Sequence, residues 1–144
     1  AQMAAAPSLP AGGNLFVSVK DADKKAIVPI VKDFAGLGFK IHATDGTASL
    51  LKENGIEVTR LNKLAQGRPN VVDMIKNGEM QFIINTPSGK QPRADEVVIR
   101  SMAVANRIPI MTTLRAAAAS VSAIKSIAHS PLTVKSLQEH HSAA

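Results

Sequence analysis

Hydrophobic and polar positions along this chain follow two periods, one typical of buried strands and one typical of amphipathic helices. Short apolar runs that predict strands lie at residues 15–19, 39–43, 56–61, 80–84 and 108–111. Helical spacing predicts helices on residues 27–37, after the turn at 44–47, and on 69–75, 95–106 and 114–128. Strands that alternate with helices predict an α/β domain of three layers (α/β/α), with helices on both faces of a parallel sheet.

Cap and turn residues refine the limits of these helices. Asp21 or Asp23 is suited to cap the first helix, and Gly38 is suited to end it. Pro29 falls inside the same helix, where proline is tolerated only near the first turn. Pro69 is suited to the first position of the helix on residues 69–75.

The composition of the chain excludes several kinds of catalytic and metal-binding site. The 144 residues are 45% hydrophobic and 19% charged, which is ordinary for one globular domain, and no apolar run approaches the length of a membrane span. The absence of cysteine excludes disulfides, thiolate nucleophiles and cysteine zinc sites. The four histidines show no metal-binding spacing, and neither a Walker loop nor a dinucleotide-binding glycine motif is present. We therefore expect no catalytic residue, metal or cofactor in this domain.

The charge favours a small anion over a nucleic acid. The formal net charge is +6, but the lysines and arginines are scattered, with no contiguous run longer than Lys24-Lys25. Nucleic-acid-binding proteins usually cluster their basic residues and add aromatic side chains for stacking. This chain has no Trp or Tyr, and its four Phe residues lie in apolar patterns.

Polar side chains follow four of the predicted strands at their carboxyl ends, where parallel α/β sheets bind ligands. The candidate effector- and phosphate-binding residues are Ser18, Lys24, Thr44, Gly46, Thr47, Lys63, Asn85 and Thr86. A glycine and hydroxyls at a helix N-terminus suit a phosphate. Two alternatives stay open here: the hydroxyls cap the helix without a ligand, and Asp45 repels an anion unless it points outward.

Six short segments carry a resemblance to a known family. They are Ser18-Val19, Asp23-Lys24, Ala43 to Ala48, Asn62-Lys63, Gly67-Arg68-Pro69, and Ile83 to Thr86 with Ser88-Gly89. In this order they resemble the C-terminal regulatory domain of the carbamoyl phosphate synthetase large subunit, which belongs to the methylglyoxal-synthase-like superfamily. The resemblance extends over residues 13–128.

The resemblance implies a five-stranded parallel sheet of order 3-2-1-4-5 and an allosteric pocket for a nucleoside monophosphate. UMP inhibits many bacterial members, and IMP activates some. The positions that match the family's phosphate and ribose contacts are Lys24, Thr44, Thr47 and Lys63. Asn85 matches a contact to the base or ribose, and Ser18 matches a residue near the ligand.

The resemblance also implies an organisation and partners. Residues 1–12 would be a linker from a preceding synthetase domain, 13–129 the regulatory domain, and 130–144 a C-terminal tail. The whole protein would be an ATP-dependent ligase that makes carbamoyl phosphate from glutamine amide nitrogen and bicarbonate for pyrimidine and arginine biosynthesis. Its partners would be the preceding synthetase domains and, through them, the glutaminase small subunit, with neither nucleic acid nor membrane. It would be cytoplasmic, or plastid in a photosynthetic eukaryote.

Two positions depart from the family pattern. Pro87 stands where a second Thr is common after Asn85-Thr86, which removes a hydroxyl and an N–H. Ile110 stands where ornithine-activated members carry an aromatic residue, although Thr112 matches their Thr. The second departure argues against a response to ornithine, and the choice between UMP and IMP stays open.

A lyase of the same superfamily is the main alternative. Methylglyoxal synthase eliminates phosphate from dihydroxyacetone phosphate with an Asp in a loop after the third strand, because proton abstraction next to a carbonyl needs a positioned base. The corresponding residues 66–70 include no carboxylate, and the guanidinium of Arg68 cannot accept a proton. Asp45 and Asp73 are the carboxylates that could substitute as the base. A nucleic-acid-binding module is the least supported interpretation.

Overall fold

Five parallel strands in the order β3-β2-β1-β4-β5 form the centre of the structure, a computed structural model that describes residues 12–87 and 94–129. The strands are β1 (Gly13–Ser18), β2 (Phe39–Ala43), β3 (Val58–Arg60), β4 (Phe82–Asn85) and β5 (Ile110–Met111). The helices are α2 (Lys24–Gly36), α3 (Asp45–Glu53), α4 (Val71–Lys76), α5 (Ala94–Ala105) and α6 (Leu114–His129). Two 3₁₀ turns, η1 (Asp21–Asp23) and η2 (Leu64–Gln66), precede α2 and α4. The three-layer class and the strand order are as predicted.

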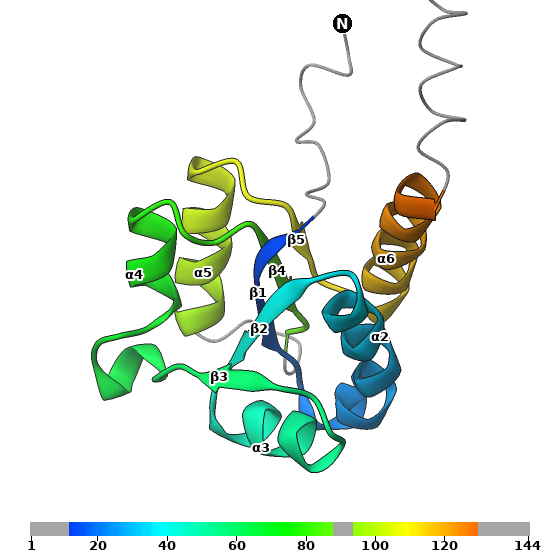
Figure 1. The fold of residues 1–144 in the computed structure, drawn as a ribbon. Coiled ribbons are helices and arrows are strands. Elements are labelled where there is room, and N and C mark those ends of the chain that lie inside the picture. The colour runs from blue at the N-terminus through cyan, green and yellow to red at the C-terminus, as the bar shows by residue number, and fades with distance from the viewer. Residues whose placement is uncertain (1–11, 88–93, 130–144) are drawn as a thin grey trace, which may run out of the picture.

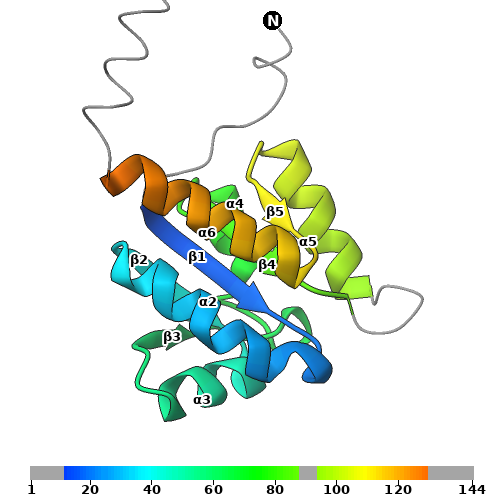
Figure 2. The same ribbon diagram turned by 90° about the vertical axis from the view of Figure 1, so that its right-hand side faces the viewer.

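Helices cover both faces of the sheet (Figure 1). One face packs against α2, α3 and α6, and Figure 2 shows α2 and α6 lying across it. Phe34 of α2 anchors this layer, with its ring centroid 5.2 Å from that of Phe39 and 5.4 Å from that of Phe82. The opposite face packs against α4 and α5 around the buried side chains of Phe16 and Ile83.

The central strand explains the continuous apolar run that predicts it. Leu15, Phe16 and Val17 are 0–1% exposed, because β1 is paired on both edges and covered on both faces. A strand in this position has no solvent-facing side, so its sequence does not alternate. The edge strand β5 is only two residues long and half-buried.

The first helix, α2, agrees only in part with its predicted cap and turn residues. Asp23 occupies the N-cap of α2 but makes no side-chain cap hydrogen bond. Gly38 follows the helix with a φ of +100°, which favours glycine, as predicted. Pro29 lies in the second turn of α2, further inside than expected, with its ring exposed.

The start of α4 differs from the prediction for a physical reason. The helix begins at Val71, because Asn70 caps it: the Asn70 side chain accepts hydrogen bonds from the N–H groups of Val72 (3.0 Å) and Asp73 (3.3 Å). Asp73 in turn accepts a hydrogen bond from the Asn70 N–H at 3.1 Å. This reciprocal capping box leaves Pro69 outside the helix, so its predicted position as first helical residue is wrong.

Candidate functional site

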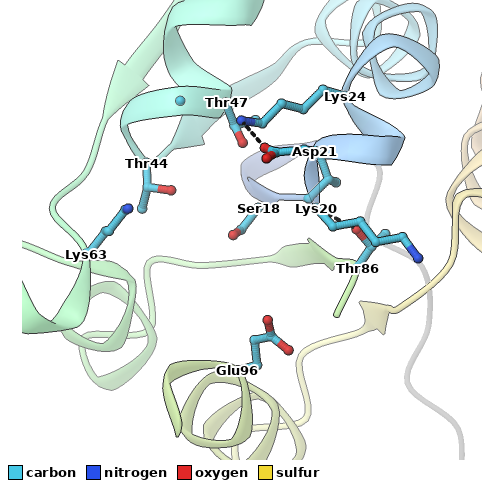
Figure 3. Close-up of a pocket in the computed structure, with 11 residues that line it drawn as sticks. Ser18, Lys20, Asp21, Lys24, Thr44, Thr47, Lys63, Thr86 and Glu96 are labelled. Carbon is cyan, nitrogen blue, oxygen red and sulfur yellow. Dashed lines mark hydrogen bonds and ion pairs between the residues drawn. The ribbon is translucent and has the colours of Figure 1, made fainter. Parts of the chain in front are cut away.

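A pocket of about 210 Å³ lies beyond the carboxyl ends of β1, β2 and β4, which we call the first pocket (Figure 3). Seven of the predicted residues line it: Ser18, Lys24, Thr44, Gly46, Thr47, Lys63 and Thr86. Its other lining residues are Val19, Lys20, Asp21 and Glu96. Side chains from five separate parts of the sequence therefore meet at one edge of the sheet.

A second pocket of about 110 Å³ adjoins the first and shares four lining residues with it: Ser18, Thr44, Lys63 and Glu96. The eighth predicted residue, Asn85, lines this second pocket, together with the apolar side chains of Phe16, Leu64, Val71 and Ile99. Asn85 is 1% exposed, and its Nδ2 has no hydrogen-bond partner among the described residues. A buried amide without a partner is costly, so this donor is suited to a ligand acceptor.

The N-terminus of α3 faces the first pocket. Thr44 is its N-cap residue, yet the Thr44 side chain makes no cap hydrogen bond, so the capping alternative does not describe this hydroxyl. The first backbone bond of the helix runs from the Ala48 N–H to the Thr44 carbonyl at 2.8 Å. The N–H groups of the three residues before Ala48 therefore have no partner within the helix, and they carry its positive dipole end.

Lys24 lies directly over this helix end. A Cβ built on Gly46 would come within 2.9 Å of the Lys24 Nζ, so the glycine allows the ammonium to approach the backbone. A cation beside a positive helix end is unfavourable without a counter-charge. Asp21 supplies one, with its Oδ1 2.8 Å from the Lys24 Nζ, from a side chain that is 95% exposed.

Asp45 points away from the pocket. The sequence left open whether its carboxylate would repel an anion there. Its carboxylate is paired with Arg60 and accepts a hydrogen bond from the Gln66 Nε2 at 3.4 Å. These bonds, first from Arg60 and then from Gln66, lower the pKa of the Asp45 carboxyl from its ordinary value. Asp45 lines neither pocket, so its charge does not oppose an anion there at close range.

Lys63 and Thr86 are placed by different hydrogen bonds. The Lys63 N–H donates to the Gln66 Oε1 at 2.7 Å, and its exposed side chain extends toward Thr44 (Figure 3). The Thr86 Oγ1 accepts a hydrogen bond from the Lys20 N–H at 3.0 Å, and the Thr86 N–H donates to the Ser18 carbonyl at 3.1 Å. Thr86 therefore holds the loop after β1 against β4 as well as lining the first pocket.

Sequence reasoning missed Glu96. It lies in the first turn of α5, is 8% exposed, and lines both pockets. An acidic residue in a first helical turn is usually explained by the helix dipole. The direction in which α5 presents Glu96 depends on how the helix packs, which the sequence pattern alone does not give.

The stretch that would hold a lyase base is arranged differently. Residues 66–70 contain no carboxylate, and Asp73 accepts hydrogen bonds from the Arg68 Nε at 2.9 Å and from the Asn70 N–H. Asp73 thus serves the capping box of α4 and lines neither pocket. Ser88 and Gly89 lie outside the described residues.

Two features are absent from the described residues, 12–87 and 94–129. No group of three or more His, Cys, Asp or Glu side chains there is arranged to hold a metal ion. No helix in those ranges is long and apolar enough to cross a membrane.

The structure is a parallel sheet covered by helices on both faces, with lysine and hydroxyl side chains around a pocket at its carboxyl edge. Residues 26–112 match the family described as "MGS-like domain", and the chain belongs to that family. It is 48% identical over 140 residues to the carbamoyl phosphate synthase large chain of Nostoc sp., covering 97% of this chain and 13% of that protein. It is 49% identical to the C-terminal section of the large chain from Aquifex aeolicus, covering 96% of this chain and 27% of that protein.

Solved structures agree on the fold. Methylglyoxal synthase from Elizabethkingia anophelis superposes with a TM-score of 0.64 at 22% identity, covering 79% of this chain and 80% of that one. The chain spans about an eighth of the length of the Nostoc relative, so most of that protein has no counterpart in these residues.

Proposed function

We propose that this chain is the allosteric regulatory domain of a carbamoyl phosphate synthase large chain and that it binds a nucleoside monophosphate, UMP or IMP. The observation that carries the proposal is the convergence of Lys24, Lys63 and the N-terminus of α3 on the first pocket. Two ammonium groups and a helix end oriented toward one cavity are suited to a phosphate dianion.

The shape of the paired pockets supports a nucleotide over a bare phosphate. The first pocket would take the phosphate, and the second, with Phe16, Leu64 and Ile99 in its walls, would take the base. The Asn85 Nδ2 would donate to a base carbonyl, a group that uracil and hypoxanthine share. Such a ligand satisfies a buried donor that otherwise has no partner.

The ligase context rests on similarity to the synthase large chains. The ligase chemistry would lie in the preceding synthetase domains, to which residues 1–12 would link this domain. The glutaminase small subunit would be reached through those domains. Carbamoyl phosphate made there would supply pyrimidine and arginine biosynthesis in the cytoplasm or a plastid, and the regulatory domain would bind no cofactor.

Thermal unfolding of the chain with added ligands tests the binding. UMP or IMP should raise the melting temperature, because a ligand that binds only the folded state stabilises it by about 2.7 kcal/mol at 100 times its Kd. Ornithine should have little effect, because Ile110 replaces the aromatic residue of its site. The absence of any shift at millimolar UMP and IMP would contradict the proposal.

A methylglyoxal synthase activity is the alternative, and a direct assay separates it. The purified chain should form no methylglyoxal from dihydroxyacetone phosphate above the uncatalysed rate, because a base for proton abstraction is missing from residues 66–70. Turnover that is lost in Asp45→Asn or Glu96→Gln would identify the base and make the protein a lyase.

A further inference from the structure

Glu96 occupies the place where the two pockets meet. Among the described residues, Asp21 lines only the first pocket and Asp95 only the second, whereas Glu96 lines both. Its carboxylate projects from α5 into the cavity, on the side opposite Thr44 and Lys63 (Figure 3). A buried carboxylate at this point repels an anion, so anion binding alone does not explain why Glu96 is there.

The ammonium groups of Lys24 and Lys63 and the Glu96 carboxylate lie on opposite sides of the cavity. Lys24, Gly46 and Thr47 line only the first pocket, whereas the Glu96 carboxylate lies across the cavity from them, where the two pockets meet. Lys63 lines both pockets on the side opposite Glu96. A carboxylate repels a phosphate but accepts hydrogen bonds strongly from hydroxyl groups. The site is therefore suited to a ligand with one anionic end and hydroxyl donors a short distance along it.

We propose that Glu96 accepts hydrogen bonds from the vicinal hydroxyls of the ligand's ribose and selects for them. This inference rests on the proposed function, because a phosphate in the first pocket and a base in the second put the connecting sugar at their junction. A carboxylate accepts up to about four hydrogen bonds, so the Glu96 carboxylate can accept from neighbouring hydroxyls beside any contact it makes within the protein. The same negative charge disfavours ligands that carry a second phosphate on the sugar.

A purely structural role for Glu96 predicts something different. An acid in the first turn of α5 stabilises the helix through its dipole, and its removal would then lower stability without changing ligand preference. A selective role predicts opposite changes for ligands with and without hydroxyls. Comparison of several ligands on one variant therefore separates the two roles.

Isothermal titration of the whole chain tests this with UMP, its 2′,3′-dideoxy analogue and inorganic phosphate. The wild-type chain should bind UMP roughly tenfold more tightly than the dideoxy analogue, since charge-assisted hydrogen bonds are lost with the hydroxyls. In Glu96→Gln that preference should fall to about threefold or less, and inorganic phosphate should bind more tightly because a repulsive charge is removed. Glu53→Gln, at the exposed end of α3, should match the wild type in every titration.

The other outcomes would contradict either the ribose contact of Glu96 or the proposed function. If Glu96→Gln keeps the full preference for UMP, or weakens UMP and the dideoxy analogue equally, the ribose contact is wrong. If the wild-type chain binds none of the three ligands, nor IMP with its dideoxy analogue in the same design, the proposed function fails and this inference fails with it. A melting curve of Glu96→Gln, taken alongside, shows that the titrated variant is folded.

Discussion

The two ends of the central strand β1 use their polar groups in opposite ways. At the amino end, the Asn14 Nδ2 donates to the Glu79 carbonyl (2.6 Å), its Oδ1 lies 3.0 Å from the His42 Nε2, and its N–H donates to the Gln81 Oε1 (2.7 Å). At the carboxyl end, the Thr44 hydroxyl makes no cap hydrogen bond to α3, and the buried Asn85 Nδ2 has no partner within residues 12–87 and 94–129.

This contrast separates structural from binding roles without reference to any ligand. Polar groups that bond to one another hold β1, β2 and the start of β4 in register. Some groups at the carboxyl end also bond one another, as Thr86 does with the Lys20 N–H. The groups there that face the cavity without a partner among the described residues, such as the Asn85 Nδ2, cost stability and are suited to a ligand. Substitutions at the amino end should therefore change stability, and substitutions at the carboxyl end should change affinity.

The largest effect is expected for Lys63→Ala. Loss of a charge-assisted hydrogen bond to phosphate removes about 1.5–3 kcal/mol, so UMP or IMP affinity should fall roughly ten- to a hundredfold. Stability should change little, because the Lys63 side chain is exposed. Calorimetric titration measures the affinity, and Lys52→Ala, an exposed lysine of α3, is the control. If Lys63→Ala binds the nucleotide with wild-type affinity, Lys63 is not the central residue of the site.

Asn14→Ala should show the opposite behaviour. It leaves the Glu79 carbonyl and the His42 Nε2 without the Asn14 side chain they share, which should lower the free energy of unfolding by about 1–3 kcal/mol. Nucleotide affinity of the folded protein should be unchanged. Urea denaturation measures the loss, and Asn54→Ala, which removes one exposed bond to the Leu50 carbonyl, should cost less. Equal losses of stability in the two variants would contradict a structural role for the amino end of β1.

Thr47→Val should have a smaller effect on binding. The Thr47 side chain is 4% exposed and lines the first pocket, and valine keeps its shape while removing the hydroxyl. We expect affinity to fall by a factor that corresponds to about 0.5–1.5 kcal/mol, the net value of one hydrogen bond. Thr47→Ser retains the hydroxyl and should retain affinity. A stability loss of about 0.5–2 kcal/mol with unchanged affinity would instead indicate a capping role.

The smallest effect concerns pH. Burial, and then the positive charge of Lys40, lower the pKa of His42 below its ordinary value, and its Nδ1 has no hydrogen-bond partner in the part of the chain that the structure describes. The unfolded chain therefore binds a proton more readily, so the contribution of neutral His42 is complete above its unfolded pKa and is lost as the pH falls below it. Melting temperatures between pH 7 and 5 should fall, and the fall should be shallower in His42→Gln. Parallel slopes for the two proteins would contradict this assignment.

Much of the fold and most of the candidate site follow from local sequence. Continuous apolar runs such as residues 15–17 identify buried strands, and Gly38 ends α2 because few other residues tolerate its backbone conformation. Lys24, Thr44, Gly46 and Lys63 were identified because parallel strands bring their carboxyl ends to one edge of the sheet. These inferences need only periodicity and topology.

Tertiary packing decided the rest. Residues 69–75 were predicted as a helix from Pro69, but the reciprocal bonds of Asn70 and Asp73 start α4 at Val71. Asp45 turns outward only because Arg60 and Gln66 meet it there, and Glu96 enters the site only because α5 packs with that residue facing the cavity. The sequence determined which groups reach the carboxyl edge of the sheet, since strands that alternate with helices run parallel and bring the residues after them to the same edge. Which of those groups bond one another and which face the cavity depended on distances between elements remote in the chain.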